Sequence, residues 1–139
     1  MVEPHTHHPH KSRIGCIVID CKGDDLTAAS EFWAGLTGYT AEIDAKYPAY
    51  ATLVTPDGEP RILLQAVDHD SRVHLDIETD DREREAARLE ALGARRIAEI
   101  KTWIVMEAPT GHRFCLVGPQ RKDFDTNATP WLNNSTDDA

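Results

Sequence analysis

The sequence predicts an α+β fold in which two tandem βαβββ units form a curved mixed sheet around a cleft, with the helices on the outside. Three observations predict it. A chain of 139 residues suits one domain with its own core, β-branched runs are interleaved with amphipathic stretches of helical period, and the order of these signals occurs twice. Asp24-Asp25 corresponds to Asp80-Asp81, and the turn Pro56-Asp57-Gly58 to Pro109-Thr110-Gly111.

The first half of the chain predicts one βαβββ unit. Strands are expected at residues 14–19, 40–44, 50–54 and 61–65, where β-branched and apolar runs are bounded by turn residues. A helix is expected from Asp24-Asp25, which we expect to cap it, to Gly38, which ends it. Its apolar side chains fall on one stripe, which we expect to be buried: Leu26, Ala29, Phe32, Trp33 and Leu36.

The second half predicts the same unit again. Strands are expected at residues 73–78, 96–100, 102–106 and 113–117. Asp80-Asp81 is expected to cap a helix that Gly93 ends, with Asp80 and Glu83 at capping-box spacing. The stripe expected to be buried consists of Ala86, Leu89 and Leu92. Each helix covers one sheet face, so the opposite faces are left to form the cleft.

Both ends of the chain are predicted to be tails outside the folded domain. Residues 1–12 are expected to be a disordered, histidine-rich tail, residues 13–120 the domain, and residues 121–139 a polar C-terminal tail. Four histidines in the first tail would chelate metal without a fixed geometry: His5, His7, His8 and His10.

Composition excludes several function classes. The net charge of −9 disfavours a nucleic-acid partner, because phosphate binding needs a basic surface. No apolar run reaches the roughly 20 residues of a membrane helix, so we expect no membrane partner. Three cysteines and no apolar leader indicate reduced thiols and a cytoplasmic protein.

Strand alternation predicts which side chains face the cleft. In residues 73–78 the apolar Val73, Leu75 and Ile77 should face the helix, so His74 and Asp76 should face the cleft. The same reasoning applied to the other strands gives one polar surface: Cys16, Asp20, Arg61, Gln65, His74, Asp76, Arg113 and Cys115. We interpret it as a small-molecule site; the alternative is a sheet face wetted by solvent.

Several of these residues are candidates for chemistry. His74 and Asp76 are the candidate catalytic pair, in which Asp76 orients His74 or takes a proton itself; two polar neighbours on a wet strand are the alternative. The matching arginines Arg61 and Arg113 suit a carboxylate or phosphate, unless they are ordinary surface arginines. The predicted ligand-binding residues are Asp20, Tyr50, Arg61, Gln65, Trp103 and Arg113.

A metal site is the alternative use of the same surface. Cys16, His74 and Cys115 would form a Cys2His set suited to zinc or a similar divalent ion. The competing interpretation is a hydrogen-bonded histidine between two cysteines that fill space. We favour the second, and therefore expect no cofactor, with a divalent metal as the alternative.

Three motifs carry a resemblance to a known family: D-x-x-x-A-x-x-F-W-x-x-L-x-G-Y from Asp25 to Tyr39, H-L-D-I-E-x-D-D from His74 to Asp81, and A-P-x-G-x-x-F-C-L-V from Ala108 to Val117. The chain resembles the vicinal oxygen chelate superfamily of glyoxalases, bleomycin-resistance proteins and extradiol dioxygenases, in its glyoxalase-like branch. The resemblance implies that residues 13–120 are a glyoxalase-like domain. It also implies four ligand positions, of which only His74 keeps a usual ligand type: Cys16, Leu63, His74 and Cys115.

The functional expectation follows from both arguments. We expect a glyoxalase-like protein that binds a small organic ligand between its repeats and sequesters or processes it. The alternative is a metal-dependent lyase, isomerase or dioxygenase of the same superfamily, and an interaction module is a third class to which no feature points. The resemblance further implies a homodimer.

Overall fold

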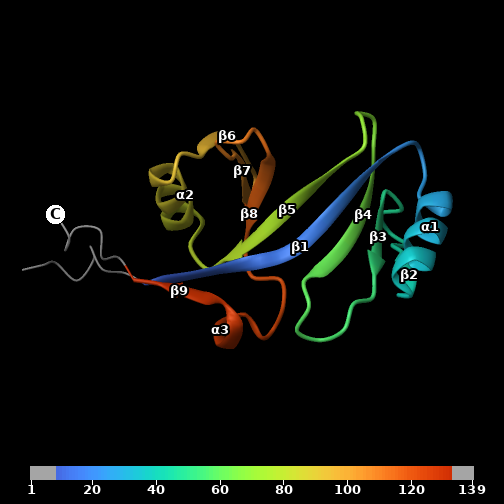
Figure 1. The fold of residues 1–139 in the computed structure, drawn as a ribbon, viewed down its shortest axis with the longest axis horizontal. Coiled ribbons are helices and arrows are strands. Elements are labelled where there is room, and N and C mark those ends of the chain that lie inside the picture. The colour runs from blue at the N-terminus through green and yellow to red at the C-terminus, as the bar shows by residue number, and fades with distance from the viewer. Residues whose placement is uncertain (1–8, 133–139) are drawn as a thin grey trace, which may run out of the picture. The chain divides into compact units, whose positions relative to one another are not determined.

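The computed structural model describes residues 9–132, in which the chain divides into two compact units. The N-terminal unit is Ile14–Asp76, and the C-terminal unit contains residues 9–13 and 77–132. The element order is βαβββ twice, followed by a short helix and strand (Figure 1). The predicted α+β class and the two tandem units are therefore confirmed.

The N-terminal unit is a helix on a four-stranded sheet. Its elements are β1 (His10–Lys22), α1 (Thr27–Thr37), β2 (Ala41–Ile43), β3 (Tyr50–Leu53) and β4 (Arg61–Val67). They follow the order β2-β3-β4-β1, and β5 (Arg72–Thr79) begins in this unit. The pair β1–β4 is parallel, while β2–β3 and β3–β4 are antiparallel. The sheet is therefore mixed, as predicted.

The core of this unit lies between α1 and one face of the sheet. Leu26, Leu53 and Leu64 are its fully buried large side chains, and Ile19 and Trp33 pack against them. The expected burial of Phe32 and Leu36 is wrong, since these side chains are 59% and 61% exposed. The short sheet supplies apolar side chains to one narrow stripe of the helix only, so the outer turn positions stay in solvent.

The ends of α1 agree only partly with the sequence. Gly38 is the C-cap at φ 78°, a left-handed conformation that glycine adopts without a Cβ clash. The N-cap is Leu26, which has no side-chain cap. Asp25, the expected cap, lies one residue too early and accepts a hydrogen bond from the Thr27 amide at 2.9 Å.

The C-terminal unit repeats the arrangement. It contains the end of β5, α2 (Arg82–Ala91), β6 (Arg95–Ile100), β7 (Trp103–Glu107) and β8 (Arg113–Val117). The pairs β6–β7 and β7–β8 are antiparallel. Asp81 caps α2 by accepting the Arg84 amide at 3.0 Å, so the capping-box reading at Asp80 is wrong by one residue.

The core of the C-terminal unit lies under α2. Ala86, Ile104, Met106 and Leu116 are its buried side chains. Ile77, Leu89 and Phe114 pack against them, which confirms the predicted parity of β8. Leu92, predicted to belong to the buried stripe, is the exposed C-cap residue that follows the helix.

Both expected tails contribute to the C-terminal unit. Residues 10–12 are the first part of β1 and pair antiparallel with β9 (Thr129–Trp131), which follows α3 (Phe124–Asn127). The Trp131 indole donates to the Ser12 hydroxyl at 2.8 Å. The domain boundaries expected at residues 12 and 120 are therefore too narrow. The histidines at positions 5, 7 and 8 lie outside the described residues.

The loop that follows β8 is fixed to β5 by a buried carboxylate. Glu78 is fully buried, and its Oε2 accepts hydrogen bonds from the backbone amides of Gln120 and Arg121 at 2.6 and 2.8 Å. Its other oxygen, Oε1, accepts a hydrogen bond from Arg13 Nε at 2.7 Å. Within residues 9–132, no helix is long and apolar enough to cross a membrane.

Candidate functional site

The sheet face opposite α1 carries the polar side chains of the N-terminal unit. Because Ile62 and Leu64 of β4 face the helix core, Arg61, Leu63 and Gln65 face the other way. Strand register arranges this face, which we call the polar face, in rows across the sheet. The rows are Tyr50–Gln65–Asp20, Thr52–Leu63–Val18 and Arg61–Cys16.

The chemical centre of the polar face is His74, with a carboxylate near each ring nitrogen. Nδ1 donates to Asp20 Oδ2 at 2.9 Å, and Nε2 lies 3.6 Å from Asp76 Oδ1. Asp20 is 2% exposed, whereas His74 and Asp76 are partly accessible. The bond to Asp20 fixes the ring so that Nε2 is the nitrogen available for chemistry.

The second oxygen of Asp20 has no partner. Oδ1 is buried and receives no hydrogen bond from any residue that the structure describes. Such an atom costs about 1–3 kcal/mol if it stays unsatisfied. Arg72, at the start of β5, reaches the same carboxylate only loosely, with Nε 3.6 Å from Oδ2. The carboxylate is therefore held on one oxygen and retains acceptor capacity on the other.

Asp76 has an environment that favours its neutral form. Burial raises the pKa of Asp76 above its ordinary value, and the charge of Asp20 acts in the same direction. The charges of His74 and Arg61 oppose this shift without cancelling it. The carboxyl therefore keeps its proton to higher pH than an exposed aspartate, which suits an acid–base role.

Most predicted residues of this unit share the polar face. Asp20, His74 and Asp76 form the cluster just described, and Arg61 is close enough to act on Asp76. Tyr50 and Gln65 are register partners of each other in β3 and β4, in the row that ends at Asp20. Their predicted role in ligand binding stays a prediction.

The remaining predicted site residues are Cys16, in the row with Arg61, and three residues of the C-terminal unit. Cys16 is buried on β1, and its thiol donates to the Ile17 carbonyl at 3.7 Å. Trp103, Arg113 and Cys115 belong to the C-terminal unit. Arg113 Nε donates to Glu107 at 3.1 Å, and the predicted ligand-binding roles of Arg113 and Trp103 stay predictions. The set Cys16, His74 and Cys115 as a metal site stays a prediction.

Sequence reasoning missed two features of the cluster. It assigned the orienting role to Asp76, two residues from His74, whereas Asp20, 54 residues away, makes the short bond. It also did not consider Arg72. Alternation along β1 did indicate that Asp20 faces the same way as Cys16 and Val18, but no local pattern shows which residue of β5 lies beside it.

Comparison with known families gives one match. The sequence model described as "Glyoxalase-like domain" matches residues 16–117, which is most of the chain. A search of curated proteins finds no match.

Comparison with solved structures identifies the same kind of fold. Methylmalonyl-CoA epimerase from Mycobacterium tuberculosis is 19% identical, with a TM-score of 0.56 over 78% of this chain and 89% of that one. A Streptomyces coelicolor methylmalonyl-CoA epimerase variant in complex with 2-nitronate-propionyl-CoA is 22% identical, with a TM-score of 0.54 over 80% and 99%. A structure named NAD-dependent benzaldehyde dehydrogenase from Legionella pneumophila is 15% identical, with a TM-score of 0.54 over 76% and 98%. At these identities the likeness concerns the fold, and the differing names show that it does not fix an activity.

Proposed function

The chain belongs to the glyoxalase-like domain family of the vicinal oxygen chelate superfamily, and on that premise we propose that it binds a small carbonyl compound at the polar face and moves a proton on it. The observation that carries the proposal is the cluster in which His74 bonds to buried Asp20 through Nδ1 and presents Nε2 toward Asp76. The methylmalonyl-CoA epimerases, which share the fold, are named for an isomerisation, and this is compatible with the proposal.

In the proposed reaction, His74 is the base. Nε2 takes a proton from the carbon next to the substrate carbonyl, and the imidazolium that forms is stabilised by the carboxylate of Asp20. Asp76 is the acid, because burial raises its pKa and so favours the protonated carboxyl that can donate to the carbonyl oxygen. The imidazolium of His74 then returns a proton to the carbon, and the enol O–H returns its proton to the carboxylate of Asp76, so both residues regain their starting protonation states.

The other predicted ligand-binding residues complete the proposal. Arg61 acts on Asp76 and supplies positive charge for an acidic group of the ligand. Tyr50 and Gln65 offer an aromatic surface and an amide in one row with Asp20. We therefore expect small carbonyl acids rather than neutral carbonyl compounds.

A divalent cation is the second candidate, and the donor set fits one. His74 Nε2 and Asp76 Oδ1 are a nitrogen and an oxygen ligand 3.6 Å apart, and a ligating histidine usually donates its other nitrogen to a carboxylate, as His74 does to Asp20. His74 and Asp76 would hold the ion, and Asp20 would orient His74. A bound ion would supply Lewis-acid stabilisation of the enolate.

Deuterium exchange tests the proposal directly. A panel of small 2-oxo acids and 1,3-dicarbonyl acids is incubated with the protein in D2O, and NMR follows both binding and loss of the carbon-bound proton. The metal-free protein, prepared with a chelator from a chain that begins at Pro9 and so keeps all of β1, is compared with the same protein plus Mg²⁺, Mn²⁺ or Zn²⁺. We expect exchange in the wild type and at least about 100-fold less in His74→Ala and Asp76→Asn.

The outcomes separate the alternatives. Exchange that needs no added ion supports the acid–base mechanism, and exchange that appears only with a divalent ion supports the second candidate. Binding without exchange under all conditions means that the protein sequesters its ligand, as a binding protein does. Exchange that survives in His74→Ala would contradict both mechanisms. The expected cytoplasmic homodimer belongs to the proposal as well, and light scattering at several concentrations tests the dimer.

A further inference from the structure

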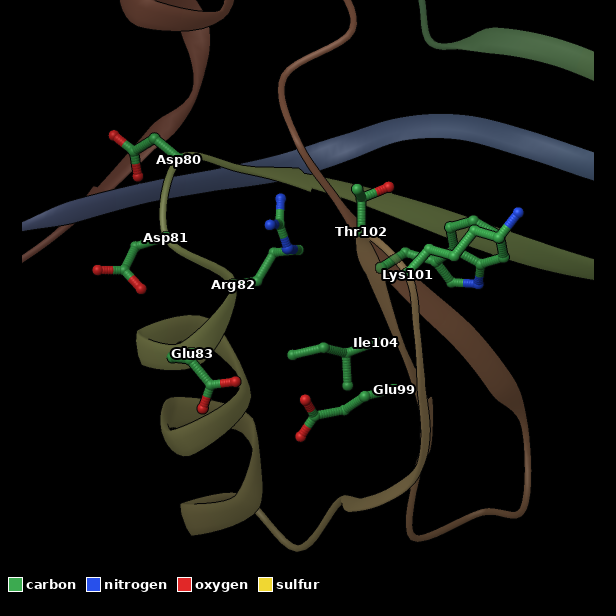
Figure 2. Close-up of a pocket in the computed structure, with 9 residues that line it drawn as sticks. Asp80, Asp81, Arg82, Glu83, Glu99, Lys101, Thr102 and Ile104 are labelled. Atoms are coloured by element: carbon green, nitrogen blue, oxygen red, sulfur yellow. The ribbon is translucent and has the colours of Figure 1, made fainter.

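A pocket in the C-terminal unit is lined by none of the residues of the proposed reaction. Its volume is about 360 Å³, which is within the roughly 300–1,000 Å³ of small-molecule sites. Figure 2 shows it between the start of α2 and the hairpin that joins β6 to β7. The lining residues are Asp80, Asp81, Arg82, Glu83, Glu99, Lys101, Thr102, Trp103 and Ile104.

Two acidic residues at the start of α2 already have partners. Asp80 accepts the Lys11 amide at 2.8 Å. Asp81 caps α2 through the Arg84 amide and pairs with the Arg84 guanidinium at 3.3 Å. These carboxylates are therefore poor acceptors for a bound cation, because binding one would compete with the bonds that begin the helix.

The other two acidic residues share a single arginine. Arg96 Nη1 lies 2.8 Å from Glu83 and 3.5 Å from Glu99. This places a neutralising charge behind both carboxylates. Asp81, Glu83 and Glu99 thus have arginine partners that do not line the pocket, whereas Asp80 accepts from a neutral backbone amide and leaves the wall with a net negative charge.

Three side chains that line the pocket, in contrast, carry hydrogen-bond donors that have no partner among the described residues. Within residues 9–132, neither the guanidinium of Arg82 nor the ammonium of Lys101 makes an ion pair or hydrogen bond, and the Trp103 indole N–H has no acceptor. Arg82 is half-buried, and in Figure 2 its side chain extends from the start of α2 toward Thr102 of the hairpin. Its Nη1 also lies beside Gly118, 3.6 Å from where a Cβ would be. A half-buried arginine with five unused donors is prepared for an acceptor that the chain does not supply.

We propose that this pocket is a second ligand site, specific for a small aromatic or apolar monocarboxylate. The carboxylate binds Arg82 in the planar two-point geometry that guanidinium groups favour. The apolar part lies against Trp103 and Ile104, which offer the ring and aliphatic surface of the pocket. A single negative charge is preferred over a polyphosphate, because the acidic walls repel each further charge.

Titration of isotope-labelled protein with matched probes tests the site. Benzoate is compared with acetate, which lacks the ring, and with benzylammonium, which keeps the ring but reverses the charge. The readout is the ¹⁵N–¹H signal of the Trp103 indole, assigned with Trp103→Phe, together with the backbone amides around Arg82. We expect benzoate to shift these signals at lower concentration than acetate, and benzylammonium to leave them unchanged.

Two variants distinguish this site from a nonspecific effect. Arg82→Gln is expected to weaken benzoate binding at least about tenfold. Arg95→Gln, which removes an exposed arginine of the same unit whose partner Glu107 does not line the pocket, is expected to change it less than about twofold. Lys101→Asn keeps a residue type that tolerates the left-handed conformation at φ 50° and is expected to weaken binding more modestly.

The result is independent of the proposed reaction. His74→Ala should leave benzoate binding at Trp103 unchanged, even if deuterium exchange proves absent. Equal shifts with benzylammonium, equal losses in Arg82→Gln and Arg95→Gln, or no shift with benzoate would each overturn the second site. The unperturbed remainder of the spectrum shows whether each variant is folded.

Discussion

Replacement of Glu78 by Gln is expected to lower the free energy of unfolding by about 3–5 kcal/mol, the usual cost of breaking a buried charge pair. Glu78 is fully buried and uses both oxygens, one for the Arg13 guanidinium and one for the amides of Gln120 and Arg121. Glutamine keeps one acceptor oxygen but turns an NH2 group toward donors. The Arg13 charge would then keep only Asp123, which is more exposed than Glu78, as its partner at 2.7 Å.

The expected loss of stability comes from the burial of the Glu78 charge, and not from the change of a glutamate to a glutamine as such. Glu83→Gln is the matched control, because Glu83 also pairs with an arginine at 2.8 Å but is 65% exposed. Exposed pairs contribute about 0–1 kcal/mol, so the control should lose less than that. In a domain of this size a loss of 3–5 kcal/mol lowers the melting temperature by about 10–15 °C.

Urea unfolding followed by circular dichroism measures both variants under the same conditions. If Glu78→Gln loses less than about 1 kcal/mol, or no more than Glu83→Gln, the carboxylate does not anchor the loop after β8 and the reasoning is refuted. If the free energy of unfolding falls with urea concentration at the same slope in both variants, unfolding exposes the same amount of surface in each.

Three further predictions concern stability. Asp76→Asn should be more stable than the wild type at neutral pH. The pKa of Asp76 is raised in the folded state, so ionisation of Asp76 costs stability as pH rises through its unfolded and then its folded pKa. The difference should shrink in thermal melts as pH falls below the ordinary pKa of an aspartate. Leu116→Ala should lose about 2–5 kcal/mol in urea unfolding, since Leu116 is fully buried under α2. Gly38→Ala should lose about 1–2 kcal/mol for its left-handed backbone alone, and Gly93→Ala should lose more, because its Cβ would also lie 3.0 Å from Pro109 Cγ. Equal losses at the two glycines would contradict the steric part of this argument.

The elements of the fold were predictable because each has a local signal. The strand predicted at residues 113–117 is observed as β8 (Arg113–Val117), and Gly38 ends α1 as expected. Alternation also separated the two faces of β4, placing Ile62 and Leu64 in the core. These signals depend only on neighbours a few residues away along the chain.

The errors concern contacts between distant residues. β9 pairs with residues 10–12 across more than 110 positions, and its sequence, Thr-Pro-Trp, carries no strand pattern. The burial of Phe32 was predicted from helical period, but how much of a helix is covered depends on the width of the sheet beneath it. The Asp20–His74 bond likewise depends on strand register, which one sequence does not encode locally.

The repeated architecture gives an internal reason to regard Asp20 as functional. β1 and β5 occupy the same place in the two βαβββ units, and each ends near a buried acid, Asp20 and Glu78. Each acid bonds to a basic residue near the start of the other strand, His74 for Asp20 and Arg13 for Glu78. The corresponding acids of the two units therefore have different kinds of basic partner, a histidine for Asp20 and an arginine for Glu78.

The two acids differ in how far they are satisfied. Glu78 has donors on both oxygens and a partner that is always charged, which is the arrangement of a structural anchor. Asp20 leaves Oδ1 without a donor among the described residues and bonds to an imidazole, a group that can act as a base. Evolution toward stability alone would fill that position with a second donor, because an unsatisfied buried oxygen is costly. Glu78→Gln should therefore lose stability, whereas Asp20→Asn should lose deuterium exchange at a smaller cost in stability, and similar stability losses in the two variants would remove this reason for placing the reaction at His74.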